Sequence, residues 1–301
     1  MRLAFGPGVR DAIDARRGVV ALESTVIAHG LPRPTNLETA TRLEQDVRDA
    51  GGFPATICLA DGHAVVGAGA ALLERLANEN AVAKVSTRDL APFLARGGNA
   101  IGATTVATTA EIAAQAGIEV FATGGIGGVH RGAERTMDIS ADLRALADHP
   151  IVVVCTGAKL VLDLAKTLEA LETLGVPVIG YGTDELPAFY VRSSGLPLPH
   201  RVDDPESAAR IARVQLERGA GMVICVPIPE ADAMPRAQIE HEIAEALAAA
   251  ETAGVRGAAV TPFLLARLGE ASSGKTLIAN IALLRNNARV AATIAAALAG
   301  I

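Results

Sequence analysis

Residues 118–159 concentrate side chains that could do chemistry. Two short apolar segments, 118–122 and 151–155, are typical of buried parallel strands, and small residues follow each of them. Four glycines lie in 123–128, and Lys159 lies just beyond the second apolar segment. Ligands of open α/β sheets bind outside the carboxyl ends of the strands. This part of the chain therefore predicts a catalytic centre.

Lys159 and Glu23 are the candidates for covalent and acid–base chemistry. Lys159 follows a very apolar segment, where desolvation would lower its pKa and make the amine nucleophilic toward carbonyls. A lysine that extends from a strand end to the surface fits this pattern equally well. Glu23 ends the segment 18–23, where apolar neighbours could raise its pKa for a role as general acid, although an exposed loop carboxylate is more common. His29 is either a second polar group here or an ordinary loop histidine.

Two other segments could bind an anion. Lys84 stands close to Ser86 and Thr87, a combination that suits a phosphate or a carboxylate. The small-residue turn 102–106 opens a predicted helix, and helix N-termini bind anions. Both patterns also occur in ordinary turns, so both interpretations stay open.

Asp138, Ser140 and Asp142 are spaced two residues apart at the start of a predicted helix. Their hard oxygen atoms could hold Mg²⁺ or Mn²⁺, with water molecules completing an octahedron. Capping of the helix by Ser140, with acidic residues near the positive end of the helix dipole, explains the same spacing and is favoured by it. The free amides at that helix start would then form an anion site.

Two glycine-rich segments match parts of nucleotide-binding motifs but lack their context. Residues 269–276 fit the P-loop pattern G-x-x-x-x-G-K-[ST], with Lys275 as its lysine. The preceding segment 262–268 is predicted to be helical, whereas a P-loop follows a strand. In 124–128, the dinucleotide pattern would need a glycine at His130. We expect chance matches, with a nucleotide-dependent phosphotransferase using Lys275 as an alternative function.

Composition excludes several classes of protein. The chain has 301 residues, a net charge of −6 and no basic stripe interleaved with aromatic residues, so nucleic acid binding is not expected. No apolar stretch reaches the roughly 18 residues of a membrane span, and the N-terminus lacks a signal-peptide core. Buried reduced thiols in a cytoplasmic protein are expected for the three isolated cysteines, Cys58, Cys155 and Cys225.

Predicted strands alternate with predicted helices, which favours an α/β domain spanning 1–301 with a mainly parallel sheet covered on both faces. The predicted strands are 18–23, 55–59, 84–86, 118–122, 151–155, 176–181 and 222–226. The predicted helices are 37–50, 70–78, 107–116, 141–147, 160–174, 205–218, 235–253, 262–268 and 277–298.

Two boundaries carry local signals. Thr35 and Glu38 match a capping box at the start of the helix 37–50. Asp61 and Gly62 predict a tight hairpin turn after the strand 55–59.

From about residue 18 to residue 289, the chain resembles the pseudouridine-5′-phosphate glycosidases, also called the indigoidine synthase A-like family. In the N-terminal part the resemblance rests on ALEST at 21–25, AHGLP at 28–32, PATI at 54–57, KVS at 84–86 and GATTV at 102–106. Further along it rests on TGGIGGVHR at 123–131, DISADL at 138–143, GAK at 157–159, TPFLL at 261–265, ANIAL at 279–283 and NNAR at 286–289. The number and order of these segments make the resemblance specific.

The resemblance implies reversible cleavage of the C–C glycosidic bond of pseudouridine 5′-phosphate to uracil and ribose 5-phosphate. Lys159 matches a lysine that forms a Schiff base with the ring-opened sugar, and Glu23 matches the proton donor. Asp138 matches the ligand of a divalent metal, usually Mn²⁺, although Mg²⁺ or another divalent ion could bind there. The residues matched to substrate binding are Lys84, Thr104, Thr105, Val106, His130, Ser140, Ala141, Asp142 and Asn280.

This chemistry agrees with the residue types. A C–C glycosidic bond has no leaving oxygen to protonate, so hydrolysis by paired carboxylates would be unfavourable. An imine between Lys159 and the opened ribose supplies an electron sink at the sugar's C1. Proton transfer to the departing base then needs a positioned acid such as Glu23.

The resemblance further implies an α/β/α sandwich with a mainly parallel central sheet, and a homotrimer. A small-molecule sugar-phosphate or nucleotide substrate is expected. Two further functions stay open beside the phosphotransferase: an enzyme that acts on another C-nucleoside phosphate, and a non-catalytic relative that binds phosphosugars.

Overall fold

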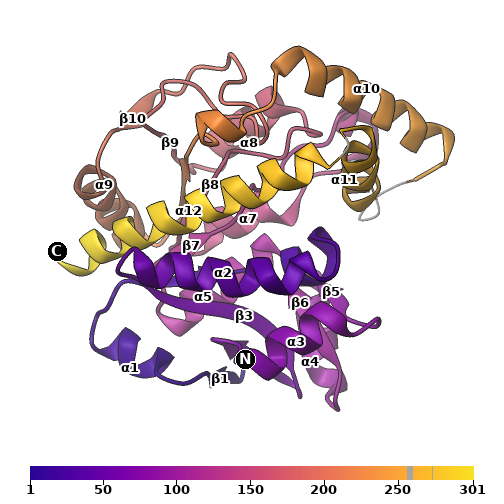
Figure 1. Ribbon diagram of the computed structural model, residues 1–301. Helices are drawn as coiled ribbons and strands as arrows, with labels where there is room; N and C mark the ends of the chain where they lie inside the picture. The colour runs from indigo at the N-terminus through magenta and orange to yellow at the C-terminus, as the bar shows by residue number, and fades with distance from the viewer. Residues whose placement is uncertain (256–259, 273) are drawn as a thin grey trace.

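The computed structural model describes residues 1–255, 260–272 and 274–301 (Figure 1). The strands are β1 (Leu3–Phe5), β2 (Val19–Leu22), β3 (Phe53–Ala60), β4 (His63–Val66), β5 (Ala83–Val85), β6 (Ile101–Thr104), β7 (Val120–Ala122), β8 (Val152–Cys155), β9 (Val178–Tyr181), β10 (His200–Val202) and β11 (Met222–Cys225). The α-helices are α1 (Val9–Asp14), α2 (Thr35–Asp49), α3 (Ala70–Asn78), α4 (Thr87–Arg96), α5 (Val106–Ala116), α6 (Ala133–Thr136), α7 (Ala141–Asp148), α8 (Leu164–Thr173), α9 (Pro205–Glu217), α10 (Arg236–Thr252), α11 (Val260–Ala271) and α12 (Lys275–Ala299). A π-helical turn, η1 (Val26–Gly30), follows β2, and a 3-10 turn, η2 (Glu230–Asp232), precedes α10.

Parallel strands form the centre of the molecule, in the order β3-β2-β7-β8-β11-β9-β10. The second half of β3 leaves this set and pairs antiparallel with β4 and β6, while β1 is parallel to β4 and β5 is parallel to β6. All four residues of β8 are completely buried. Such continuous apolar burial is expected where helices cover both faces of a parallel sheet.

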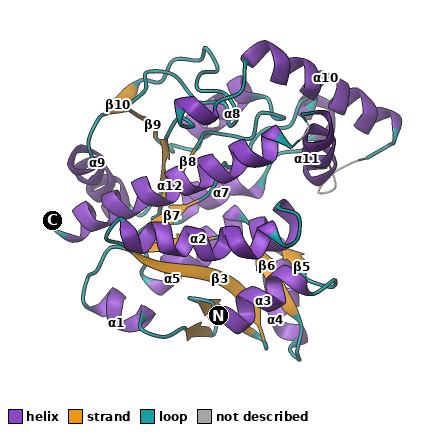
Figure 2. Ribbon diagram, in the orientation of Figure 1, coloured by secondary structure: helices purple, strands orange, loops and turns teal. Residues whose placement is uncertain are grey.

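Helices form a layer on each face of the sheet, as Figures 1 and 2 show. On one face α12 packs against β2, β7 and β8, and α2 packs beside it against β3. On the other face α5 packs against β2 and β3, and α7 packs against β11 and α5. The predicted α/β/α arrangement with a mainly parallel sheet is confirmed.

Every predicted strand and helix has a counterpart, and the hairpin is confirmed as well. Ala60 pairs with His63, and the two turn residues Asp61 and Gly62 have φ values of 52° and 75°. Positive φ at both positions is what a two-residue type I′ turn requires. All three cysteines are buried and free, as predicted.

The capping box predicted at Thr35 and Glu38 is wrong. Thr35 is already the first residue of α2 and Pro34 takes the cap position, and in the first turn it is the Asn36 side chain that accepts from a backbone amide, that of Leu37. A capping box does occur at the start of α4, where Ser86 and Asp89 cap each other's backbone amides. The motif therefore formed at one of the two segments for which an anion site and an ordinary turn were both left open.

Two other boundaries differ from the prediction. The predicted helix 160–174 begins only at Leu164, because the Asp163 side chain accepts from the Lys166 amide and so caps α8. In the segment 102–106, the predicted turn is the end of a buried strand, β6. Thr105 caps α5 directly after it.

None of the helices in the described ranges combines the length and the apolar character needed to cross a membrane.

Candidate active site

Three neighbouring parallel strands bring the predicted chemistry together. Glu23 follows β2, Thr123 follows β7 and Lys159 lies four residues beyond β8, and these strands are adjacent in the sheet. Because their carboxyl ends meet at one edge, residues distant in the sequence converge there, as expected for an open α/β sheet.

Residues 123–128, here called the glycine loop, run alongside residues 156–159, here called the lysine loop. The Thr156 amide donates to the Gly124 carbonyl (2.9 Å), the Ile126 amide to the Gly157 carbonyl (3.1 Å), and the Lys159 amide to the Ile126 carbonyl (3.1 Å). This ladder fixes the backbone that carries Lys159 against the backbone that carries Thr123.

Glycine is required in this loop because other groups approach its backbone. A Cβ at Gly125 would lie 2.8 Å from the Phe189 ring and 3.0 Å from the Gly157 carbonyl oxygen. A Cβ at Gly127 would overlap the Ser140 hydroxyl and lie 2.8 Å from an Asp142 carboxylate oxygen. The glycines thus allow close packing against Phe189, the lysine loop and the start of α7.

A cavity of about 70 Å³ lies where these loops meet η1 and α12. Its polar side chains come from strand ends and loops that are far apart in the sequence. The residues that line it are Glu23, Thr25, Val26, His29, Gly30, Lys84, Thr123, Gly124, Gly125, Lys159, Phe189, Asn280 and Leu284. Of the predicted site residues, the cavity therefore brings together Glu23, Lys84, Lys159 and Asn280.

Burial and charge tune the ionisable groups of the cavity. Burial raises the pKa of the Glu23 carboxyl, while Lys159 and a hydrogen bond from Thr123 lower it by less. Burial, and next the like charge of Lys159, lowers the pKa of the Lys84 ammonium. A carboxyl group with a raised pKa holds its proton to higher pH, which suits a proton donor.

Lysines are rare in this chain, which makes their placement informative. The sequence contains four, and two of them, Lys84 and Lys159, line this one cavity. Lys166 is engaged at the surface with Glu134 and Asp163. Lys275 is exposed at the first position of α12.

Asp142 is buried beside the cavity and binds backbone amides with both carboxylate oxygens. Oδ1 accepts from the Ala107 amide (2.9 Å) and Oδ2 from the Gly127 amide (2.7 Å). The predicted anion site at the start of α5 is therefore already served by a carboxylate of this chain. Ser140 caps α7, as predicted, by accepting from the Asp142 amide (3.2 Å), and Ala141 begins that helix.

Thr104, Thr105 and Val106 lie at the junction of β6 and α5, outside the lining of the cavity. The Thr104 side chain is completely buried, and its hydroxyl donates to the Ile57 carbonyl and accepts from Thr109. Thr105 caps α5, and Val106 is buried in the core. Their side chains order this junction, and their contact with substrate stays a prediction.

The metal site predicted at Asp138 has few protein ligands. His130 Nδ1 lies 3.8 Å from Asp138 Oδ2. Both carboxylate oxygens of Asp142 are already occupied, because each accepts a hydrogen bond from a backbone amide. Within the described ranges, no three His, Cys, Asp or Glu side chains are grouped so as to hold a metal ion. The donor set fits only a hydrated ion held by Asp138, a mode that Mg²⁺ and similar ions use in proteins.

Several residues of the site were not predicted as such from the sequence. Thr123 donates to Glu23 Oε1 (2.5 Å), and Asn287 binds the Thr123 carbonyl (2.8 Å). Phe189 enters the cavity from a loop, with a φ of 57° that is unusual for a residue with a side chain. Thr123 stands inside the glycine motif and Asn287 inside the NNAR segment, which were signals, but Phe189 had no local pattern to reveal it.

His29 lies on η1 at the mouth of the cavity. Burial and the nearby Lys84 lower its pKa, and a hydrogen bond to the Val82 backbone acts in the opposite direction. Single π-helical turns are frequent at functional sites. Of the two interpretations of His29, the structure thus favours the second polar group of the site.

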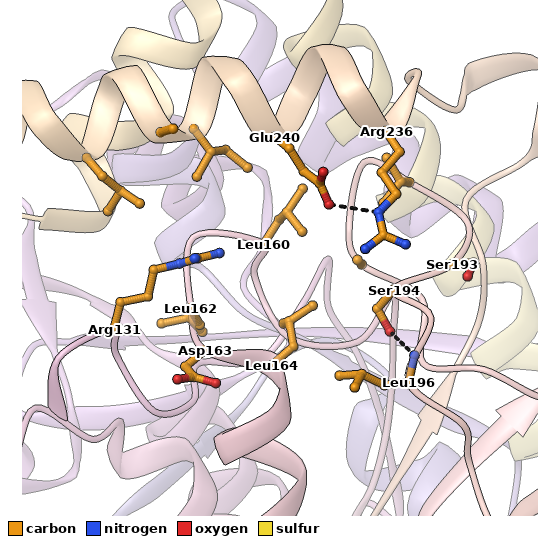
Figure 3. Close-up of a pocket in the computed structure, with 15 residues that line it drawn as sticks. Arg131, Leu160, Leu162, Asp163, Leu164, Ser193, Ser194, Leu196, Arg236 and Glu240 are labelled. Atoms are coloured by element: carbon orange, nitrogen blue, oxygen red, sulfur yellow. Dashed lines mark hydrogen bonds and ion pairs between the residues drawn. The ribbon is translucent and has the colours of Figure 1, made fainter. Parts of the chain in front are cut away.

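A larger cavity of about 480 Å³ is lined in part by residues that directly follow the lysine loop (Figure 3). Leu160 and Leu162 line it, and α10 closes one side. Its charged residues are partly paired, since Arg236 Nε lies 2.7 Å from Glu240 Oε1 across its rim (Figure 3). Because Glu23, Lys84 and Lys159 do not line it, the chemistry favours the smaller cavity as the active site.

The segment that matches the P-loop pattern does not have P-loop structure in its described residues. Residues 269–271 belong to α11, residue 273 lies outside the described residues, and Gly274 precedes α12. A helix therefore precedes the motif where a P-loop needs a strand. The structure supports the interpretation of a chance match.

Comparisons with known proteins identify the family. The profile of the indigoidine synthase A-like protein family matches residues 8–297. Among curated relatives, the pseudouridine-5′-phosphate glycosidase of Myxococcus xanthus is 52% identical over 302 residues, which cover 99% of each chain. That of Jannaschia sp. is 54% identical over 301 residues, which cover 98% of each chain.

Two solved structures are closely similar along the whole chain. A prealnumycin C-glycosynthase in complex with ribulose 5-phosphate superposes with a TM-score of 0.92 at 45% identity, covering 100% of this chain and 98% of that one. An indigoidine synthase A-like protein from Thermotoga maritima superposes with a TM-score of 0.88 at 35% identity, covering 99% and 97%. The chain therefore belongs to the indigoidine synthase A-like family of enzymes.

Proposed function

We propose that this enzyme reversibly cleaves the C–C glycosidic bond of pseudouridine 5′-phosphate, releasing uracil and ribose 5-phosphate. The observation that carries the proposal is the convergence of Glu23, Lys84 and Lys159 in one cavity at the ends of adjacent strands. The names of the full-length relatives support the choice of substrate.

Lys159 is the proposed nucleophile. Ring opening breaks the bond between C1 and the ring oxygen, which takes up a proton, and Lys159 Nζ then forms a bond to C1 to give an amine adduct. When the bond between C1 and uracil C5 breaks, its electron pair goes to C5, and the nitrogen lone pair forms the C=N bond of the imine. Uracil leaves with a proton on C5, and water then hydrolyses the imine to ribose 5-phosphate and free Lys159. No oxidant or reductant is needed, which agrees with a site built from a lysine and a carboxyl group.

Glu23 is the proposed proton donor. Burial raises the pKa of this carboxyl group, so the protonated form persists at higher pH than in an exposed glutamate. A donor with a pKa closer to the working pH transfers its proton more efficiently. Lys84 supplies positive charge close to both groups and suits the 5′-phosphate.

The size of the cavity bears on how the substrate binds. Its volume of about 70 Å³ is below the roughly 300–1,000 Å³ of typical small-molecule sites, so surrounding side chains must move for a nucleotide to enter. His29 at the mouth and Phe189 on its loop are the side chains placed to do so.

A divalent ion, Mn²⁺ or Mg²⁺, remains part of the proposal in a limited role. Asp138 would hold it together with water molecules, and a hydrated cation there would help to neutralise the substrate phosphate. We assign it no contact with the reacting bond. We also propose the homotrimer implied by the resemblance, which sedimentation or light scattering would test.

A related C-glycosidic substrate is the second candidate. The structural neighbour that is 45% identical to this chain is named as a prealnumycin C-glycosynthase. Its structure contains the pentose phosphate ribulose 5-phosphate. This candidate would be favoured if the enzyme released uracil from pseudouridine 5′-phosphate much more slowly than it released the base of another C-nucleoside phosphate.

Borohydride trapping tests the proposal directly. Purified protein is incubated with pseudouridine 5′-phosphate and Mn²⁺, reduced with borohydride and digested, and peptides are examined for a ribose-phosphate adduct. With four lysines in the chain, each can be assigned individually. We expect the adduct on the Lys159 peptide, together with free uracil.

Lys159→Ala should abolish both the adduct and uracil release. Lys166→Ala is the matched control, because Lys166 belongs to the next helix but binds Glu134 and Asp163 at the surface. Absence of both adduct and uracil in the unaltered enzyme would overturn the proposal, and an adduct on Lys84 would overturn the assignment of the nucleophile.

A further inference from the structure

Thr123 lines the cavity and contacts the carboxyl group proposed as proton donor. Its hydroxyl donates to Glu23 Oε1 over 2.5 Å, across a gap of 100 residues in the sequence. The side chain is 2% exposed, and no other acceptor is recorded for this hydroxyl among the described residues. The carboxyl group proposed as proton donor thus has a fixed neutral partner from the neighbouring strand.

The backbone of Thr123 is held on both sides. Its amide donates to the Val154 carbonyl of β8 (3.1 Å), and its carbonyl accepts from Asn287 Nδ2 (2.8 Å). A threonine side chain has few χ1 choices once its backbone is fixed. The direction of the hydroxyl is therefore set by the fold and not by Glu23 alone.

Asn287 connects Thr123 to the lysine loop. This side chain is completely buried on α12, and its Nδ2 also donates to Thr156 Oγ1 (3.0 Å), while Thr156 Oγ1 donates to Asn287 Oδ1 (3.2 Å). Thr156 stands three residues before Lys159. A single amide therefore binds the loop that presents the proton donor's partner and the loop that presents the nucleophile.

We propose that Thr123 is a positioning residue that orients the Glu23 carboxyl for proton transfer, and that Asn287 keeps Thr123 in register with the loop of Lys159. The inference rests on the proposed function for its catalytic consequence, but the contact between Thr123 and Glu23 can be tested without any substrate. Because Glu23 Oε1 accepts from the Thr123 hydroxyl at 2.5 Å, Oε2 is the carboxyl oxygen available to exchange a proton with the substrate.

The same contact sets the direction of a change in titration. Burial raises the pKa of Glu23, and Asp142 adds to this, whereas Lys159, Thr123 and Lys84 lower it. Removing the Thr123 hydroxyl takes away one lowering contribution and leaves the charged neighbours in place. The Glu23 pKa should then rise further.

Thr123→Val removes the hydroxyl with little change of shape, and Thr123→Ser keeps it. In the substrate-free enzyme, ¹³C NMR of labelled glutamate, with Glu23→Gln to assign the signal, measures the carboxyl titration. We expect the midpoint to move to higher pH in Thr123→Val and to return toward the original value in Thr123→Ser. An unchanged midpoint in Thr123→Val would overturn the proposal, whatever the substrate of the enzyme proves to be.

Steady-state kinetics of uracil release test the catalytic part. In Thr123→Val, kcat should fall by about 10- to 100-fold, within the range that a positioned acid contributes, with KM changed less than about twofold. Trapping of the sugar on Lys159 should persist. The alkaline limb of the pH–rate profile should move to higher pH, since the acid keeps its proton longer.

The double variant separates positioning from a general structural effect. If Thr123 acts through Glu23, adding Thr123→Val to Glu23→Gln should lower kcat no further. A further drop of tenfold or more would show a role independent of Glu23 and overturn the inference. Complete inactivity of the unaltered enzyme on pseudouridine 5′-phosphate would instead refute the proposed function, and the NMR titration would still decide the role of Thr123.

Discussion

Asp142 links the start of α5 to the glycine loop, and its replacement by asparagine tests how that loop is held. The carboxylate accepts from the Ala107 amide at 2.9 Å and from the Gly127 amide at 2.7 Å, and the residue is 6% exposed. Asparagine has nearly the same shape but only one acceptor oxygen, and its NH₂ group would face an amide donor. One of the two amides must therefore lose its partner.

The cost follows from the burial of these groups. A buried donor left without an acceptor costs about 1–3 kcal/mol, and more where the lost partner was charged. We expect Asp142→Asn to lower the free energy of unfolding by about 2–3 kcal/mol, a large part of the roughly 5–15 kcal/mol available to a typical protein. Uracil release should also fall, because Gly127 belongs to the glycine loop that packs against the loop of Lys159.

Urea unfolding followed by far-ultraviolet circular dichroism measures this loss, provided that the slope with denaturant is unchanged. Asp148→Asn is the matched control on the same helix, since the Asp148 side chain is 42% exposed and forms a surface ion pair with Arg144. An exposed pair of this kind contributes about 0–1 kcal/mol. A loss below about 0.5 kcal/mol in Asp142→Asn would refute the reasoning that both amides depend on this carboxylate.

Two further predictions concern the support of the site. Burial alone would raise the pKa of Asp46, but hydrogen bonds from Arg285 and Arg289 of α12 lower it overall. Its contribution to stability is therefore present above the ordinary carboxyl pKa and lost as pH falls through the lower folded value. Asp46→Asn should cost about 1–3 kcal/mol at pH 7 in urea unfolding and nearly nothing at the lowest pH, and an equal loss at both pH values would contradict this assignment. Gly125→Ala should reduce the rate of uracil release at least about tenfold, because the new Cβ would lie 2.8 Å from the Phe189 ring and push it. The free energy of unfolding without substrate should change less. Unchanged kinetics would show that the ring moves freely.

Much of the fold could be predicted because its signals are local. The buried strand β8 reads as a continuous apolar segment, and Asp61-Gly62 specifies a hairpin turn by positive φ alone. The edge strands β1 and β10 escaped prediction. The residues of β1 are all only partly buried, and β10 has two exposed residues out of three, so neither shows the apolar pattern of a central strand.

Local signals also misled where two outcomes share one pattern. Thr35 and Glu38 have the spacing of a capping box, yet the chain entering through Pro34 places Thr35 inside the helix. The spacing of Asp138, Ser140 and Asp142 allowed a metal site but favoured a helix cap, and the cap formed, with the Asp142 oxygens bound by the amides of Ala107 and Gly127. Which partner a polar side chain takes depends on groups that arrive from elsewhere in the chain.

For the site, the sequence by itself determined that a lysine would follow a buried strand and that a carboxyl group would follow another, because strand ends and burial are written in local apolar patterns. Only the tertiary structure decided that Glu23 meets Thr123, 100 residues away, and that Asn287 reaches the Thr123 carbonyl from 164 residues further on. Hydrogen bonds form between atoms within about 3 Å, and the order of strands in the sheet decides which atoms come that close. That order follows from the burial of all the strands and helices together, and no short segment of the chain contains it.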